Sequence, residues 1–91
     1  MDWFEWDRAK NAVNQDKHGV SFAEARRAFV DPARVIYPDL DHSATETRYF
    51  CLGRVDGKVM TVRFTWREGR IRIFGAGFWR KGKMLYDRTR T

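Results

Sequence analysis

Arginine side chains recur at alternating positions in the C-terminal half of this sequence, and this pattern has a clear chemical meaning. Guanidinium groups bind phosphate through paired hydrogen bonds, so several of them on one surface favour a polyanion. Phe50 and Phe74 flank one of them, and arginine beside aromatic rings is typical of surfaces that bind single-stranded RNA. The alternative is that these are ordinary solvent-facing residues. The arginines concerned are Arg48, Arg63, Arg67, Arg70 and Arg72.

Cleavage of RNA is a reaction that such a surface performs with few further groups. The 2′-hydroxyl of RNA attacks the adjacent phosphate, so a protein supplies only a base, an acid and positive charge. Arg48, Arg67 and Arg72 are candidates for the charge, and Glu46, opposite Arg67, is the nearest candidate base. Glu46 has a second interpretation, as a salt-bridge partner that holds Arg67. His18 is a candidate acid or base, or else a structural cap at the end of a helix.

The other motifs indicate neither a cofactor nor a metal ion. Gly75-Ala76-Gly77 lacks the third glycine and the βαβ context of a dinucleotide-binding fingerprint, so we expect a tight turn there. The two histidines, His18 and His42, lie on separate expected elements without further ligands at metal-binding spacing. Lys17, Arg80 and Lys81 are either further phosphate contacts or solvated surface.

Three strands must position the arginines. Residues 48–55, 58–67 and 70–76 are strand-like and are separated by Asp56-Gly57 and Glu68-Gly69, which favour two-residue hairpin turns. This register places Thr65 between Arg48 and Arg72, Arg67 between Glu46 and Arg70, and Arg63 between Phe50 and Phe74. All of these side chains then share one face. The opposite face is apolar, and we expect the helices to pack there; it carries Tyr49, Cys51, Met60, Val62, Phe64, Trp66, Ile71 and Ile73.

The remaining elements follow from capping and stop signals. Asp7 and Gly19 bound a helix over 8–18, and Ser21 to Glu24 form a capping box that starts a second helix, stopped by Asp31-Pro32. We further expect a short edge strand at 3–6, a strand at 34–37 closed by Pro38, and a helix at 80–88 with Met84 and Leu85 facing inward. The fold class is α+β.

Composition and charge narrow the function. The chain has 91 residues, and we expect a single domain over 1–91. Its net charge is +6, and residues 62–91 carry nine Lys and Arg against two acids, a net of +7, which indicates a polyanion or an acidic protein as partner. A single cysteine, no membrane-spanning apolar run and no basic signal region predict a cytoplasmic protein without a membrane partner.

An ordered set of short motifs runs from about Phe4 to Tyr86. The motifs are Phe4-Glu5-Trp6-Asp7 with Lys10 and Asn14; Lys17 to Phe22 followed by Ala25, Phe29 and Asp31-Pro32; and His42-Ser43, Glu46-x-Arg48, Gly53, Thr65-x-Arg67 and Ile71-Arg72-Ile73. With these motifs in this order, the chain resembles the BrnT-type toxins of bacterial toxin–antitoxin pairs.

The resemblance implies a RelE-like fold with two N-terminal helices, an antiparallel sheet of about four strands and a C-terminal helix. It also implies a ribonuclease toxin that inhibits translation. The implied partners are RNA, a ribbon-helix-helix antitoxin of the BrnA type and, only through that antitoxin, operator DNA. The residues that it singles out are Lys17, His18, Glu46, Arg48, Arg67 and Arg72. Many members end the last strand with Ser-Ala-Arg, whereas this chain has Gly75-Ala76-Gly77, so Arg80 or Lys81 would have to replace an arginine at 77.

Two other interpretations stay open at this point. One is a noncatalytic basic module that binds RNA or protein within a repressor complex, which the absence of an arginine at position 77 favours. In the other, the basic face mainly receives an acidic segment of the antitoxin.

Overall fold

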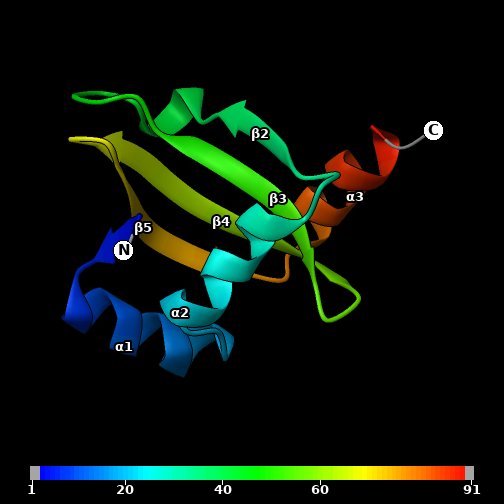
Figure 1. The fold of residues 1–91 in the computed structure, drawn as a ribbon, viewed down its shortest axis with the longest axis horizontal. Coiled ribbons are helices and arrows are strands. Elements are labelled where there is room, and N and C mark those ends of the chain that lie inside the picture. Colours follow the sequence, from blue (N-terminus) through cyan, green and yellow to red (C-terminus); the bar gives the residue numbers. More distant parts are fainter. Residues whose placement is uncertain (1–2, 90–91) are drawn as a thin grey trace.

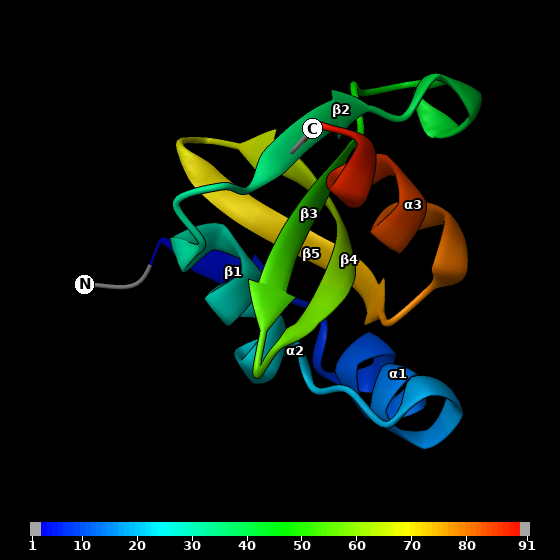
Figure 2. The same ribbon diagram turned by 90° about the vertical axis from the view of Figure 1, so that its right-hand side faces the viewer.

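The fold is a five-stranded sheet with helices on both of its faces (Figures 1 and 2). A computed structural model describes residues 3–89. The strand order is β1-β5-β4-β3-β2. Within residues 3–89, no helix is both long and apolar enough to span a membrane. In chain order the elements are β1 (Phe4–Trp6), α1 (Arg8–His18), α2 (Phe22–Ala25), the 3-10 helix η1 (Arg26–Val30), β2 (Val35–Pro38), the 3-10 helix η2 (Leu40–His42), β3 (Tyr49–Val55), β4 (Lys58–Arg67), β5 (Arg70–Gly77) and α3 (Arg80–Arg88).

The two hairpins of the expected meander form as the turn residues predict. Asp56 and Gly57 both have positive φ, 51° and 82°, which is the backbone of a type I′ turn. The predicted pairs Thr65–Arg72, Arg67–Arg70 and Phe50–Arg63 are all present. The predicted pairing of Arg63 with Phe74 is wrong, because a register shift between Arg63 and Phe64 places Arg63 opposite Gly75. Such a bulge leaves one residue of a strand without a direct partner.

The expected edge strand at 3–6 is present as β1, and it makes the sheet a mixed set of five strands instead of the antiparallel set of about four that the resemblance implied. β1 pairs in parallel with β5, with Glu5 opposite Arg72. The chain between these two strands is long, so turn chemistry does not determine the direction of their pairing. At the other edge, β2 ends at Pro38, where a missing N–H removes no bond from the interior of the sheet.

The N-terminal helices begin where their caps predict. The Asp7 carboxylate accepts from the Lys10 N–H, and this bond holds the pKa of Asp7 below its ordinary value. Gly19 closes α1 with a φ of 67°. Ser21 and Glu24 form the predicted capping box. The second helix is shorter than expected, because after one α-helical turn the chain winds more tightly as η1.

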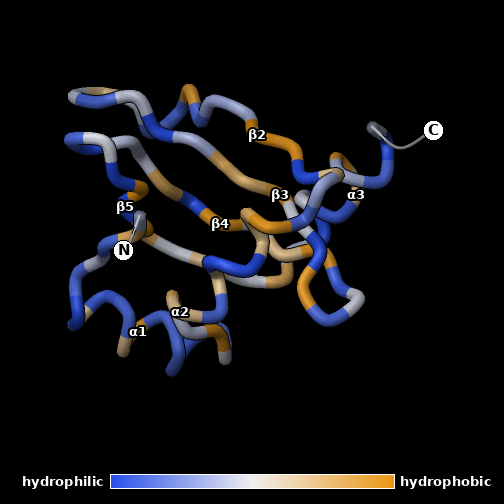
Figure 3. The backbone as a smooth tube through the Cα atoms, in the orientation of Figure 1, coloured by the Kyte–Doolittle hydropathy of each residue, from blue (hydrophilic) through white to orange (hydrophobic). Residues whose placement is uncertain are grey.

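The core is divided between the two faces of the sheet. The expected apolar face packs under α2 and η1, and the buried cluster between them includes Phe22 of α2 and Met60, Val62 and Phe64 of β4. α3 packs on the opposite face (Figure 2), where we expected the arginines with Phe50 and Phe74 and no helix. Tyr86 is buried there. Most of α1 is hydrophilic (Figure 3), and none of its residues belongs to either cluster.

Glycine explains why α3 reaches the sheet. A Cβ at position 82 would collide with the Thr61 hydroxyl and crowd Leu52, so only glycine permits this close approach. Leu85 faces this second cluster as predicted. The prediction for Met84 is wrong, because 54% of that residue is exposed. Trp66, expected on the apolar face, is 53% exposed and lies outside the main cluster.

Candidate RNA-binding site

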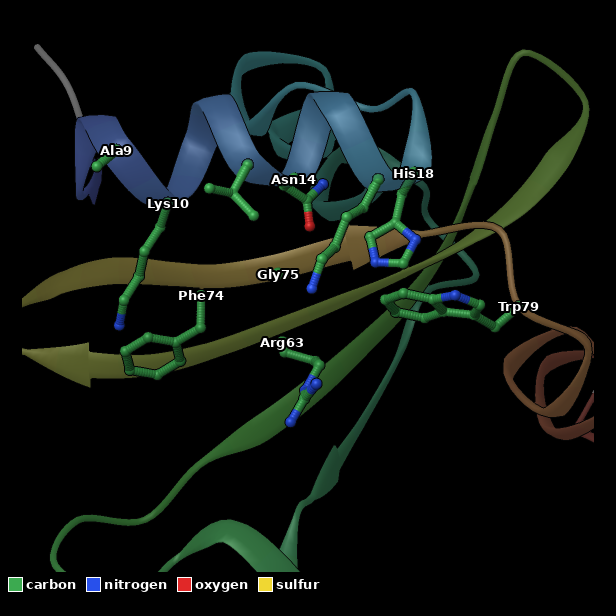
Figure 4. A pocket seen from close by; sticks show the side chains of 10 residues that line it. Ala9, Lys10, Asn14, His18, Arg63, Phe74, Gly75 and Trp79 are labelled. Carbon is green, nitrogen blue, oxygen red and sulfur yellow. The ribbon is translucent and has the colours of Figure 1, made fainter.

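A concave pocket of about 350 Å³ lies where α1 meets the middle of β4 and β5 (Figure 4). In Figure 4, Lys10 and Phe74 lie at one end, His18 and Trp79 at the other, and Arg63 lies across from α1. The lining residues are Ala9, Lys10, Val13, Asn14, Lys17, His18, Arg63, Phe74, Gly75 and Trp79.

Asn14 anchors α1 to the edge of β5 beyond the end of β1. Its buried amide donates to the carbonyls of Val20 at 2.8 Å and Ala76 at 2.9 Å, and its oxygen accepts from the Ala76 N–H at 3.2 Å. The side chain therefore satisfies backbone groups that a neighbouring strand would otherwise satisfy. Because Lys10, Lys17 and His18 share this helix, Asn14 also determines where those side chains lie.

The pocket lining is basic and contains no carboxylate. Lys10, Lys17 and Arg63 contribute three cations, and His18 adds an imidazole ring. Within residues 3–89, Arg63 forms no ion pair with a carboxylate. The His18 and Trp79 rings pack nearly perpendicular to each other, with the ring centroids 5.1 Å apart. This arrangement suits a phosphate group that is held by cations and lies beside an imidazole.

Phe74 connects this pocket to a second group of charged residues around Glu46. The Arg48 guanidinium lies 4.2 Å from the centroid of the Phe74 ring. Glu46 accepts two hydrogen bonds from Nη2 of Arg67, both 3.1 Å long, and lies 3.8 Å from the Arg48 guanidinium. Its carboxylate thus holds Arg48 and Arg67 together on the same face of the sheet.

Arg72, on β5 beside the edge strand β1, is held in a similar way. Its Nη1 atom lies 3.2 Å from the Glu5 carboxylate, on the strand with which it is in register. In the part of the chain that the structure describes, Arg48, Arg67 and Arg72 therefore have acidic partners. The interpretation of Glu46 as a salt-bridge partner of Arg67 is confirmed, whereas the pairing of Arg72 with Glu5 was not predicted. Arg70 is exposed at the hairpin turn opposite Arg67.

A family model, described as "Ribonuclease toxin, BrnT, of type II toxin-antitoxin system", matches residues 6–82. This chain belongs to the BrnT family. A search of the curated proteins found no match. The BrnT family consists of ribonuclease toxins, which have RNA as substrate and an antitoxin as partner. The resemblance inferred from the ordered motifs is thereby confirmed.

The structure separates the expected site residues of this BrnT family member into two groups and leaves others outside both. Lys17, His18, Arg63 and Phe74 line the pocket, and Glu46, Arg48 and Arg67 adjoin it through Phe74. Phe50 does not present a free ring, because it packs against the second core cluster below α3. Arg80 and Lys81 are exposed in the first turn of α3, outside the pocket lining. His42 bonds the buried carboxylate of Asp39 at 3.0 Å and lies elsewhere.

Sequence reasoning missed two residues that line the pocket. Lys10 was quoted only as part of a motif, although it stands seven residues before Lys17 and hence on the same helical face. Trp79 gave no signal of its own. Its ring lies against the backbone of Gly77, where a Cβ would approach the indole to 2.7 Å. Gly77 thus makes room for Trp79 and is part of the strand, not of the tight turn that we expected.

Residues 3–89 contain no group of three or more His, Cys, Asp or Glu side chains arranged to hold a metal ion.

Proposed function

We propose that this chain is an endoribonuclease that uses the substrate's own 2′-hydroxyl as nucleophile and needs no metal ion. The 2′-oxygen forms a bond to phosphorus, the bond from phosphorus to the 5′-oxygen breaks, and the products are a 2′,3′-cyclic phosphate and a 5′-hydroxyl. One proton passes from the 2′-hydroxyl to a base, and another passes from an acid to the leaving oxygen. The observation that carries this proposal is the basic pocket that is lined both by His18 and by Arg63, which has no carboxylate partner among residues 3–89.

We assign His18 as the base that takes the 2′-hydroxyl proton, with solvent water supplying the proton to the leaving 5′-oxygen. We assign the stabilisation of the pentacovalent phosphate to Arg63, Lys17 and Lys10. His18 is exposed, and its contact with the Trp79 ring orients the imidazole toward the pocket. Cations already in position stabilise charge that develops in the transition state without reorganising. Arg63 meets this condition best, because no acidic group of residues 3–89 competes with the phosphate for its guanidinium.

We assign Glu46 a positioning role. Its carboxylate oxygens accept two hydrogen bonds from Arg67 and lie 3.8 Å from the Arg48 guanidinium, so they hold both side chains in place. Through Glu46, Arg48 and Arg67 lie where the RNA backbone continues past Phe74, and Glu5 holds Arg72 at the adjacent edge. Arg70, exposed opposite Arg67 on the neighbouring strand, adds a further cation to this row of arginines.

The order of elements and the family also support proposals about the fold and the partners of this toxin. We propose a RelE-like relationship on the order of elements, in which two N-terminal helices precede an antiparallel meander and a C-terminal helix. We also propose that the toxin inhibits translation in the cytoplasm. A ribbon-helix-helix antitoxin of the BrnA type would neutralise it and carry the complex to operator DNA.

The test is cleavage of RNA in excess chelator. The wild-type chain should yield 2′,3′-cyclic phosphate ends, and an RNA with a single 2′-deoxy sugar at the cleaved position should stay intact. His18→Ala and Arg63→Ala should each lower the rate about 10²-fold or more. Arg26→Ala, an exposed arginine outside the pocket, is the matched control. Cleavage at the deoxy position, or full activity of His18→Ala, would refute the mechanism.

One observation favours a second function, a noncatalytic basic module within a repressor complex. Position 77 has glycine where the resemblance implied an arginine, and the Trp79 ring lies beside it. This alternative predicts salt-sensitive RNA binding without strand scission in the same assay.

A further inference from the structure

A second basic groove, of about 520 Å³, lies on the other side of Trp79 from the pocket described above. It is bounded by the β3–β4 hairpin and the first turns of α3. Its lining residues are Arg54, Gly57, Lys58, Val59, Phe78, Trp79, Arg80, Lys83 and Asp87. Trp79 lines both hollows, so the two are adjacent and share one aromatic wall.

The groove has an excess of positive charge. Four cations line it against one carboxylate, and Asp87 already pairs with Lys83 at 2.7 Å. The Arg54 guanidinium lies 5.5 Å from the centroid of the Tyr86 ring, and Lys58 lies 5.9 Å from that of Phe78. Aromatic rings orient these cations but do not neutralise them. Arg54, Lys58 and Arg80 therefore hold charge that an anionic ligand would compensate.

The start of α3 adds to this excess. Trp79 occupies the N-cap position without a capping side-chain hydrogen bond, and the first turn contains no acidic residue. Arg80 and Lys81 instead place two cations beside the positive end of the helix dipole, which is unfavourable without an anion nearby. Phe78, 45% exposed, presents an aromatic ring at the same place.

We propose that this groove binds the sugar–phosphate backbone of the RNA on one side of the cleaved bond, with a base stacked on Phe78. The inference rests on the proposed function for the identity of the ligand. An RNA strand held in the first pocket continues past Trp79 into the second groove, where Arg54, Lys58 and Arg80 contact its phosphates. The groove thus makes affinity depend on RNA length, whereas the bond-breaking groups stay in the first pocket.

The experiment measures how the affinity for RNA depends on RNA length and on salt concentration. A trinucleotide and a decanucleotide, both 2′-O-methylated so that they are not cleaved, are bound to the wild-type chain and to Arg54→Gln/Lys58→Gln. The double variant should bind the decanucleotide roughly tenfold more weakly near 0.1 M salt, with the slope of log K against log salt reduced by about 1.4 for two lost phosphate contacts. Binding of the trinucleotide should be unchanged. Arg26→Gln/Arg34→Gln, which removes two exposed charges outside both hollows, is the matched control.

Each result leads to a decision. Equal losses for both RNAs, or no change for either, would overturn the groove as an RNA subsite. If the double variant keeps its RNA affinity but loses affinity for the purified antitoxin, the groove belongs to the protein partner and the proposal is wrong. A wild-type chain that shows the length effect but cleaves no unmodified RNA would refute the proposed function and leave this inference standing. A thermal unfolding midpoint that matches wild type shows that the double variant is folded.

Discussion

Asn14 provides a direct test of how the structure holds α1, and with it the site, against the sheet. Replacement by alanine removes three buried hydrogen bonds to the backbone of Val20 and Ala76. Each such bond contributes about 1 kcal/mol to stability, and leaving its backbone partner buried and unsatisfied adds to the loss. Alanine recovers about 0.6 kcal/mol through its higher helix propensity. We therefore expect the free energy of unfolding to fall by about 2 to 3 kcal/mol.

The assay is urea denaturation followed by tryptophan fluorescence, with Gln15→Ala as the control. Gln15 is an amide on the exposed side of the same helix, and its replacement should change the free energy of unfolding by less than about 0.5 kcal/mol. Asn14→Asp should also lower the free energy of unfolding. An aspartate keeps the acceptor for the Ala76 N–H but loses both donated hydrogen bonds. A loss below about 1 kcal/mol for Asn14→Ala would refute the conclusion that this amide substitutes for a strand at the edge of β5.

Two further predictions concern the packing of the sheet. Gly82→Ala should destabilise the protein by about 1 to 3 kcal/mol in the same assay, although alanine normally favours a helix, because the new Cβ meets Thr61. Thr61→Ala should restore much of that loss, since the Thr61 hydroxyl is buried without a hydrogen-bond partner among residues 3–89; no rescue would contradict the close approach of α3. Burial raises the pKa of the Cys51 thiol from 9.0 to about 12, so the native thiol should resist alkylation at pH 9, and the reagent should react at the rate of unfolding. Because the unfolded thiol ionises first, stability should be retained below pH 9.0 and decline above it; fast alkylation of the folded chain would contradict this burial.

Local chemistry accounts for the parts of the fold that the sequence predicted well. Turn residues with positive φ act over four positions, so the pairs at Thr65 and Arg67 followed from Asp56-Gly57 and Glu68-Gly69 alone. The caps of α1 and α2 also involve neighbours only three or four residues apart. The bulge opposite Arg63 was not predictable in this way. The alternation of side chains along β5 looks the same whether Arg63 pairs with Phe74 or with Gly75, so the sequence does not distinguish the two registers.

The candidate site was predicted only in part, for a related reason. Alternation placed Arg63, Arg67 and Arg72 on one face of the sheet, and that placement is correct. The same register placed Glu46 beside Arg67, with which it pairs, but it gave no acidic partner for Arg72. Glu5 reaches Arg72 only because β1 joins the edge of the sheet, across a long separation in sequence. The second groove was missed because its cations come from β3, β4 and α3 together.

The sequence by itself determined the family, the hairpins, the helix ends and the basic character of one sheet face, because these depend on neighbouring residues or on ordered motifs. Only the tertiary structure decided which side of the sheet α3 covers, how β1 pairs, and where α1 presents Lys17 and His18 to Arg63. The physical reason is that each of these depends on contacts between distant segments. Gly82 and Asn14 permit those contacts, but the sequence around them does not indicate that their partners are Thr61 and Ala76.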